Sequence, residues 1–324
     1  MYKILGIGNA LVDVMTLIPD DNVLEKFSLP KGSMQLVDNE KSELIKSETM
    51  NFSRSLASGG SAANTIHGLA MLGVDTAFIG SIGKDDLGDF FENDMKKAGI
   101  STILSRSDSP TGTAVALISS DYERTFATHL GAAVDLEASH LKQGDFSGYD
   151  ILYLEGYQIY NKPLIETACR LARNENMKIA LDLASYNVVE ANLSAFKEII
   201  EKYVDILFAN EDEARAFTGM EPEEALHAIS RICRMAVVKI GKDGSWIKRG
   251  DEIIKIGKAE VNVKDTTGAG DLYAAGFLFG YANNRNLEVC GKYGSILAGK
   301  VIEILGARMD NNRWKEIEAI ISEI

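Results

Sequence analysis

The chain has 324 residues, enough for one large domain or for a domain with an appendage. Its hydrophobic content of 46% and charged content of 25% are ordinary for a globular protein. The net charge of −13 argues against nucleic acid as a partner, because a phosphate backbone needs a positive surface. A small anionic ligand stays open, since a local site can oppose the overall charge.

Cysteine usage and hydropathy indicate the compartment. The three cysteines, Cys169, Cys233 and Cys290, are far apart and lack metal-ligand spacing, which favours a reduced, cytoplasmic protein. The opening MYKILGIGNALVDVM lacks a basic region and a cleavage site, so we expect a strand there and no signal peptide. No apolar run approaches the length of a membrane span, and we expect no membrane contact.

Apolar, β-branched runs alternate with helical patterns along most of the chain. Strands that are apolar throughout and separated by helices indicate a buried, mostly parallel sheet, and therefore an α/β fold. The expected strands cover 3–8, 76–82, 150–154, 178–182, 205–209 and 235–240. The expected helices cover 61–72, 86–98, 163–176, 190–202 and 223–233.

Three short segments, 11–18, 33–37 and 112–128, break this rhythm. The first two precede the first long helix, and the third alternates like a β-hairpin around SDYE. Because no helices separate these strands, we expect them to form a small second sheet beside the core, in the position of a lid. The prediction is a single folding unit over 1–324, with lid strands inserted at about these three places.

The segment DTTGAGDLYAAGF, residues 265–277, places glycines and acids directly ahead of an apolar helical run. Gly268 and Gly270 permit close backbone approach, and the helix is expected to begin near Ala269. Its unpaired N–H groups and dipole would form an anion hole, with Asp271 beside it. A plainer interpretation stays open, in which Asp271 favours a helix start and the glycines turn the chain.

Other phosphate-binding motifs are absent from the sequence. There is no G-x-x-x-x-G-K-[ST], and GIGNAL lacks the third glycine of a dinucleotide fingerprint. These absences disfavour a P-loop NTPase and a Rossmann oxidoreductase.

DTTGAGD resembles the C-terminal signature of the ribokinase-like (PfkB) carbohydrate kinases. GNALVD (8–13), ASGGSAAN (57–64) and GSIGKDDLG (80–88) are similar to that family's sugar-binding segments and early helix. The resemblance runs from about residue 4 to residue 309, with the motifs in the expected order. It implies a three-layer α/β/α sandwich with a mostly parallel central sheet and a small β-sheet lid.

Within the family, the chain is most similar to adenosine kinases of bacterial type. The segments that resemble their lid and nucleotide regions are MQLV (34–37), PTGTAVALI (110–118) and YVDILFANEDEA (203–214), and the bacterial type is suggested by LEGY (154–157) and GARM (306–309). The resemblance implies that the γ-phosphoryl group of ATP is transferred to a primary hydroxyl.

In this mechanism Asp271 matches the catalytic base, and Gly268, Ala269 and Gly270 match the anion hole. Phosphoryl transfer depends on positioning and charge stabilisation, which these groups supply. The helix start is expected to lower the pKa of Asp271 and so to weaken the base, a loss that late proton transfer would tolerate.

The acceptor side is expected at two places near the N-terminus. The resemblance assigns the sugar hydroxyls to Asn9, Asp13, Gly59, Gly60 and Asn64. A carboxylate and an amide suit a diol, because together they accept and donate hydrogen bonds. The alternative is a turn whose helix is capped by Ser58 or Ser61.

The nucleotide side is expected in two later segments. Asn210 and Glu213 have capping-box spacing, and the resemblance also makes Asn210 a nucleotide-binding residue and Glu213 an indirect ligand of Mg²⁺ through water. Lys239, Gly241 and Gly244 resemble the nucleotide loop, although an ordinary hairpin is the alternative.

Two further assignments come from the resemblance. Asp265 and Thr267 are similar to a monovalent-cation loop completed near Gly306, which would hold K⁺. Arg124, on the second strand of the hairpin, matches an arginine that lies close to the phosphates and would act in catalysis. The alternative for Arg124 is a solvated arginine on an edge strand.

The acceptor itself is the least determined part. A nucleobase needs an apolar or aromatic slot, for which Gln35, Leu36, Ala116 and Tyr157 are the candidates. Adenosine leads, but the chain has GYQ where animal adenosine kinases carry consecutive phenylalanines, so inosine, guanosine or a free sugar such as ribose or fructose stays open. A catalytically silent nucleoside-binding protein is disfavoured by the intact GAGD and N-x-x-E, and a monomer and a homodimer are equally compatible.

Overall fold

The computed structural model describes residues 2–257 and 261–324, and two sheets organise this part of the chain. The larger one has the strand order β14-β13-β12-β11-β10-β9-β1-β5-β6. Its strands are β1 (Ile4–Ile7), β5 (Thr76–Gly83), β6 (Ser101–Ser107), β9 (Ile151–Glu155), β10 (Lys178–Asp182), β11 (Ile206–Asn210), β12 (Met235–Lys239), β13 (Ser245–Arg249) and β14 (Glu252–Ile256). Neighbours from β12 to β6 are parallel, whereas β13 pairs antiparallel with both β12 and β14.

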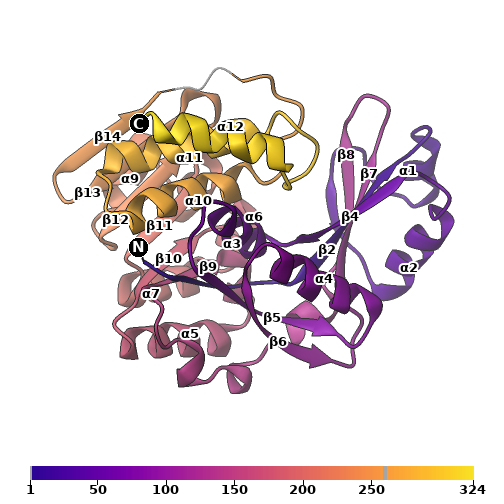
Figure 1. Cartoon of the computed structure of the whole chain (residues 1–324), viewed down its shortest axis with the longest axis horizontal. Coiled ribbons are helices and arrows are strands. Elements are labelled where there is room, and N and C mark those ends of the chain that lie inside the picture. The colour runs from indigo at the N-terminus through magenta and orange to yellow at the C-terminus, as the bar shows by residue number, and fades with distance from the viewer. Residues whose placement is uncertain (1, 258–260) are drawn as a thin grey trace.

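Helices cover both faces of this sheet (Figure 1). One face packs α3 (Ser61–Met71), α4 (Asp86–Lys97), α10 (Ala269–Ala282), α11 (Leu287–Val301) and α12 (Asn311–Ser322). The other packs α5 (Lys162–Asn174), α6 (Tyr186–Ala191), α7 (Leu193–Tyr203), α8 (Glu211–Thr218) and α9 (Pro222–Ile229). Along β9, Ile151 and Tyr153 join the first core whereas Leu152 and Leu154 join the second, because successive strand residues face opposite sides. The three-layer α/β/α sandwich is confirmed.

The smaller sheet has the order β3-β8-β7-β2-β4 and lies to one side of the body, with two short helices against it (Figure 1). It comprises β2 (Leu11–Leu17), β3 (Met34–Leu36), β4 (Arg54–Gly59), β7 (Gly112–Ile118) and β8 (Arg124–His129), beside α1 (Asn22–Lys26) and α2 (Asn39–Glu48). The predicted hairpin is confirmed, since β7 and β8 are antiparallel neighbours. Strand β4 was not predicted, because RSLASG has little intrinsic strand preference and is specified by its pairing with β2.

Other boundaries also differ from the expected ones. The helix expected at 190–202 is two helices, α6 and α7, separated at Asn192. The Asn192 side chain donates to Val188 O at 3.0 Å, a local hydrogen bond that competes with a continuous helix. The edge strand β6 and the last two helices, α11 and α12, were not anticipated.

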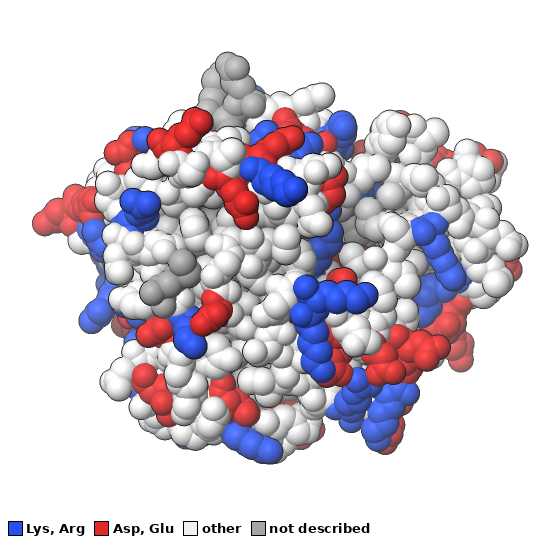
Figure 2. Space-filling model, viewed as in Figure 1, with Lys and Arg blue, Asp and Glu red and all other residues white. Residues whose placement is uncertain are grey.

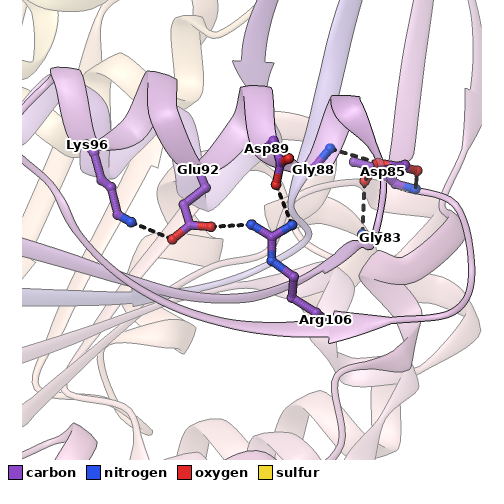
Figure 3. A network of polar contacts seen from close by, with 8 residues as sticks. Gly83, Asp85, Gly88, Asp89, Glu92, Lys96 and Arg106 are labelled. Atoms are coloured by element: carbon purple, nitrogen blue, oxygen red, sulfur yellow. Dashed lines mark hydrogen bonds and ion pairs between the residues drawn. The ribbon is translucent and has the colours of Figure 1, made fainter.

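The GSIGKDDLG segment fastens α4 to the hairpin (Figure 3). Asp85 caps α4 by accepting from the N–H of Gly88 at 2.8 Å, and it also accepts from the N–H of Thr111 at 2.8 Å. Farther along the helix, Arg106 of β6 bridges Asp89 and Glu92 (Figure 3). Because Thr111 directly precedes β7, these contacts set where the hairpin leaves the body.

Acidic and basic side chains are intermixed on the face shown in Figure 2, so this face has no continuous positive surface. Within residues 2–257 and 261–324, no helix combines the length and the apolar character needed to cross a bilayer. Cys169, Cys233 and Cys290 are free thiols in the protein interior.

Candidate active site

A cavity of about 1580 Å³ lies between the two sheets. A pocket for one small ligand usually has about 300–1,000 Å³, so this cavity has room for two ligands side by side. The small sheet contributes Asp13, Ala114 and Phe126 to its wall, and the body contributes the start of α10. No residue of 80–88 is among the described lining residues.

The larger sheet delivers polar residues to this cavity at the carboxyl ends of its parallel strands, where open α/β sheets bind ligands. Five cavity-lining residues stand at these strand ends: Asn9, two residues after β1, and the last residues of β9, β10, β11 and β12, which are Glu155, Asp182, Asn210 and Lys239. Asn9, Asn210 and Lys239 were predicted from the sequence, whereas Glu155 and Asp182 were not. Both acids end an apolar strand, which was the available signal.

The start of α10 has the predicted position. Gly268 is the N-cap with φ +76°, a left-handed conformation, and a Cβ there would lie 2.7 Å from that of Ala307. The N–H of Ala269 donates to Thr266 O at 3.2 Å. Among the described residues, no backbone acceptor is recorded for the N–H groups of Gly270 and Asp271, and both residues line the cavity. These two N–H groups are therefore available to an anion.

Asp271 is held from a helix far away in the sequence. Its Oδ1 accepts from Ser61 Oγ at 2.7 Å and its Oδ2 accepts from Asn64 Nδ2 at 3.0 Å. Burial raises the pKa of Asp271 to about 6, although the hydrogen bonds from Asn64 and Ser61 lower it. The expectation that the helix start leaves this carboxylate a weakened base is therefore wrong, because desolvation outweighs the favourable interactions of the charged form.

Glu155 connects the two acceptor-side loops. Its carboxylate accepts from the N–H of Asn9 and from the N–H of Ala62, both at 2.8 Å. Burial raises the pKa of Glu155 to about 7, against the lowering effect of these two N–H groups. From the end of β9, the Glu155 carboxylate thus caps the helix α3 and also holds the backbone of Asn9 in place.

The helix start at α3 departs from the simple capping alternative. The N-cap is Gly60, with φ +100° and no side-chain cap, and Ser61 donates to Asp271 instead. Asp13 is buried, which raises its pKa to about 6, and a Cβ at Gly59 would overlap its carboxylate. Gly59 therefore shapes the site from behind without lining it.

Asn64 has one side-chain atom without a partner. Its Nδ2 is fixed toward the Asp271 carboxylate, which in its charged form only accepts hydrogen bonds. Its Oδ1 is buried and unpaired among the described residues, and Asn64 lines the cavity. Because an unpaired buried acceptor costs free energy, this oxygen is suited to a ligand hydroxyl.

Acidic groups and two lysines, Lys239 and Lys242, line the other half of the cavity. Lys239 Nζ pairs with Asp182 Oδ2 at 2.8 Å, and a Cβ placed on Gly270 would lie 3.2 Å from that Nζ. The ammonium group is therefore close to the start of α10. Burial lowers the pKa of Lys239, but Asp182 and Glu213 outweigh this effect and raise it overall.

The Asn210–Glu213 capping box is present at the start of α8. Glu213 accepts from the N–H and from Nδ2 of Asn210, both at 2.8 Å, and Asn210 Oδ1 accepts from the N–H of Glu213 at 2.8 Å. Burial, and then the charge of Asp182, raises the pKa of Glu213. Asn210, Glu213, Gly241 and Gly244 all line the cavity, and the last two belong to the predicted turn between β12 and β13.

The carboxylates of the cavity fit a Mg²⁺ ion that is held through water molecules. In the described part of the chain, no group of three or more His, Cys, Asp or Glu side chains is arranged to cage a metal. Asp182, Glu213 and Asp271 nevertheless line the same cavity. Lys239, which also lines it, is the basic partner of Asp182. A polyphosphate would be repelled by these carboxylates unless a divalent cation came with it, and Mg²⁺ usually keeps several waters.

Arg124 and Asp265 lie behind the cavity wall. Arg124 Nη1 is 2.6 Å from Asp265 Oδ2 and donates to Thr267 Oγ1 at 3.0 Å. Arg124 is neither an exposed edge-strand residue nor a lining residue, and only Thr267 of the three lines the cavity. The Asp265 carboxylate is already paired with a cation, so this loop does not fit K⁺ as an additional ligand.

The small sheet supplies an apolar wall. Its lining residues are Leu11, Met34, Leu36, Ala114, Phe126 and Thr128, and the body adds Leu130, Val134, Leu136, Tyr157 and Tyr160. Gln35 is not among them, because its register partner is the buried Ala127 on the opposite face of the sheet from Met34 and Phe126. The expectation that Gln35 faces the slot is therefore wrong, whereas Leu36, also expected there, does line the cavity together with Met34. Ala116 is opposite Phe126 but does not line the cavity.

The cavity brings together most of the predicted site residues. Those that line it are Asn9, Asp13, Leu36, Gly60, Asn64, Tyr157, Asn210, Glu213, Lys239, Gly241, Gly244, Thr267, Gly268, Ala269, Gly270 and Asp271. Those that do not are Gln35, Gly59, Ala116, Arg124 and Asp265.

Comparison with known proteins agrees with this architecture. The model of the pfkB family carbohydrate kinases matches residues 32–314. The crystal structure of adenosine kinase from Sinorhizobium meliloti is similar, with 36% identity, a TM-score of 0.87 and coverage of 98% of this chain and 99% of that one. A probable sugar kinase from Rhizobium etli CFN 42 is similar with 33% identity, a TM-score of 0.88 and 98% coverage of each chain. The 5-dehydro-2-deoxygluconokinase of Bacillus subtilis (strain 168) is 29% identical, covering 85% of this chain and 89% of that protein.

Proposed function

This chain belongs to the pfkB family of carbohydrate kinases, and we propose that it transfers the γ-phosphoryl group of ATP to the primary hydroxyl of a ribonucleoside, with adenosine as the acceptor and AMP as the product. The observation that supports this most directly is the position of Asp271. It is a buried carboxylate at the start of α10, in a cavity with room for both substrates.

In the proposed reaction the acceptor hydroxyl oxygen attacks the γ-phosphorus, the bond to the β-phosphate oxygen breaks, and ADP leaves. Asp271 takes the hydroxyl proton. Its pKa of about 6 lets it be ionised at neutral pH while remaining a better base than an ordinary aspartate. Ser61 and Asn64 hold both of its oxygens and so orient the carboxylate.

The transferring group would be stabilised from the start of α10. The free N–H groups of Gly270 and Asp271 and the helix dipole offer positive potential to the γ-phosphate oxygens. Lys239 adds a full charge beside Gly270. Electrostatic stabilisation of this kind is the main requirement of phosphoryl transfer.

The nucleotide would lie along Asn210, Gly241 and Gly244 at the far end of the cavity. Glu213 would orient waters on Mg²⁺ rather than bind the metal directly, since Asn210 already donates to both of its oxygens. When bound, Mg²⁺ neutralises charge on the β- and γ-phosphate oxygens.

The acceptor sugar would lie between β2 and α3. Asp13 offers a carboxylate and Asn64 offers its unpaired Oδ1, so that two neighbouring hydroxyls each find an acceptor. Asn9, whose backbone Glu155 holds, lies beside them. These contacts suit ribose equally in a nucleoside and as the free sugar.

The apolar wall favours a nucleoside. Met34, Leu36 and Phe126 are on the same face of the small sheet and line the cavity beyond the sugar position. A free sugar would leave this surface in water, whereas a nucleobase would cover it and gain about 1–3 kcal/mol by stacking on an aromatic ring. The likeness to the Sinorhizobium meliloti adenosine kinase supports the same acceptor.

The second candidate is a sugar kinase of the same family. It is supported by the likeness to the probable sugar kinase of Rhizobium etli and to 5-dehydro-2-deoxygluconokinase. Gln158 and Asn161, which line the slot among the apolar residues, would then bind further hydroxyl groups.

The two candidates are separated by turnover with Mg·ATP against adenosine, inosine, guanosine, ribose, fructose and 5-dehydro-2-deoxygluconate. Adenosine with the highest kcat/KM supports the proposal, and a free sugar above every nucleoside refutes it. Asp271→Asn serves as the inactive control for contaminating kinases. Binding of adenosine without turnover of any acceptor would instead identify a silent binding protein.

A further inference from the structure

A buried ion pair joins the small sheet to the loop before α10. Arg124 is the first residue of β8, and Asp265 lies four residues before α10 begins. Arg124 Nη1 and Asp265 Oδ2 are 2.6 Å apart, with side chains only 5% and 7% exposed. A buried carboxylate needs a positive partner, and Arg124 is the basic side chain paired with Asp265 in the described part of the chain.

The Asp265 carboxylate also organises two backbone segments. Its Oδ1 accepts from the N–H of Thr267 at 3.1 Å, and its Oδ2 accepts from the N–H of Gly306 at 2.8 Å. Thr267 directly precedes the N-cap Gly268, and Ala307 is the residue against which Gly268 packs. Asp265 therefore holds both segments that fix the start of α10.

The arginine occupies the place where this loop would use a dissolved cation. Arg124 contacts two of the groups that the sequence suggested for K⁺, Asp265 Oδ2 and Thr267 Oγ1. The third part of the expected cation loop is near Gly306, and a Cβ placed on that glycine would lie 4.0 Å from Arg124 Nη2. A monovalent ion placed on the same oxygens would meet an unscreened guanidinium charge within a few ångströms.

We propose that Arg124 is a positioning residue that replaces a monovalent cation, supplying from the small sheet the positive charge that holds Asp265 and, through it, the start of α10. The arginine acts through Asp265 and does not touch the transferring phosphate. The guanidinium is a permanent charge, so the loop is charge-compensated at any K⁺ concentration. Nε and Nη2 of Arg124 are buried and have no hydrogen-bond partner among the described residues. The guanidinium therefore serves this loop more through its charge than through its hydrogen bonds.

Two consequences follow for the protein. Its turnover and its thermal stability do not respond specifically to K⁺. Removal of the guanidinium leaves a carboxylate-lined space that a dissolved cation can enter, so the variant acquires a response to K⁺ that the parent lacks. The stability consequence is independent of the acceptor, and only the turnover consequence depends on the proposed kinase activity.

The test compares the full chain with its Arg124→Met variant in chlorides of K⁺, Na⁺ and tetramethylammonium at equal ionic strength. Thermal melting and turnover with Mg·ATP and the preferred acceptor are both measured. We expect the parent to vary less than twofold in turnover and to show no saturable shift in melting temperature. We expect the variant to lose at least tenfold in tetramethylammonium, to recover at least fivefold in K⁺, and to melt at a higher temperature in K⁺ with saturation.

Three further variants complete the test. Arg106→Met, which removes an arginine paired with Asp89 and Glu92 on the surface, should leave the parent's behaviour unchanged. Arg124→Lys should keep turnover independent of K⁺, because it keeps the charge. If Arg124→Met does not fold, the double variant Arg124→Met with Asp265→Asn removes both charges and should fold without a K⁺ response.

The outcomes are distinguishable. Each of three results would overturn the proposal: activation of the parent by K⁺ of twofold or more, a folded Arg124→Met variant that is indifferent to every cation, or a double variant that still responds to K⁺. A melting response in the variant without turnover of any acceptor would support the cation replacement while refuting the proposed function.

Discussion

Asn64 Nδ2 donates a 3.0 Å hydrogen bond to Asp271 Oδ2 across 207 positions of sequence. The contact joins α3, which borders the acceptor side, to α10, whose start is the candidate phosphate site. One amide therefore orients the Asp271 carboxylate with its nitrogen and leaves its oxygen unpaired toward the cavity. In the proposed reaction this arrangement would couple acceptor binding to the geometry of proton removal.

Asp271→Asn should lower kcat by at least about 100-fold, because the amide cannot take the hydroxyl proton. The fold should persist, since the substitution removes a buried charge that burial already disfavours. Steady-state kinetics and thermal melting check both points. Asp86→Asn is a matched control, because Asp86 is an exposed acid in the first turn of α4. Turnover of Asp271→Asn close to that of the control would remove Asp271 from the mechanism.

The pH profile should report the same group. With a pKa of about 6, Asp271 is protonated below pH 6 in the free enzyme, so kcat/KM should rise with pH up to about 6 and then level. The folded pKa lies above the ordinary 3.8, so the folded protein binds this proton more tightly than the unfolded chain. The unfolding free energy of Asp271→Asn relative to the parent should therefore increase as pH rises from about 4 to about 6. Denaturant titrations of both proteins at the two pH values measure this difference in unfolding free energy. A difference that stays constant or declines between pH 4 and pH 6 would contradict the raised pKa.

Glu155→Gln should weaken acceptor binding by loosening the backbone at Asn9 and at the start of α3. A glutamine amide would place donors against the N–H of Asn9 or of Ala62, where two acceptor oxygens are now used. At pH 8 we expect about 1–3 kcal/mol lower unfolding free energy and a KM for the acceptor raised on the order of tenfold. Glu198→Gln, which alters a surface acid paired with Lys162, is the control. Unchanged KM and stability would show that Glu155 does not hold these loops.

Phe126→Ala distinguishes a nucleoside from a sugar. If a base stacks on this ring, KM for the nucleoside should rise on the order of tenfold, which corresponds to 1–3 kcal/mol of stacking. KM for any free sugar that is turned over should change little. Tyr122→Ala, at the exposed turn of the same hairpin, is the control. Equal effects on sugar and nucleoside would place the base elsewhere.

Glu213→Gln tests the metal role against the capping role. The glutamine keeps one acceptor oxygen but leaves either the N–H or Nδ2 of Asn210 without an acceptor, so the unfolding free energy should fall by about 1–3 kcal/mol. If Glu213 also orients waters on Mg²⁺, the Mg²⁺ concentration for half-maximal turnover should rise on the order of tenfold. Asp38→Asn alters the N-cap of α2 and serves as a capping control. An unaltered Mg²⁺ dependence would leave capping as the whole role.

The parts of the site that could be predicted from sequence are those written into local patterns. Asn210 and Glu213 form a capping box, and Gly268 is the N-cap of α10. Both could be predicted because three-residue spacings and left-handed glycines act within one turn of the chain. The orientation of Gln35 could not be predicted, since three residues of β3 contain no clear alternation, and the pairing with β8 decides which face each side chain takes.

By itself the sequence determined the alternation of buried strands and helices, the hairpin of the small sheet and the glycine-led start of α10, because periodicity and backbone preference are local properties. Only the tertiary structure decided that Asp271 has a raised pKa, that Glu155 holds two loops and that Arg124 pairs with Asp265. Each of these depends on burial or on contacts between segments far apart in the chain, and neither desolvation nor a partner across the fold leaves a pattern in neighbouring residues.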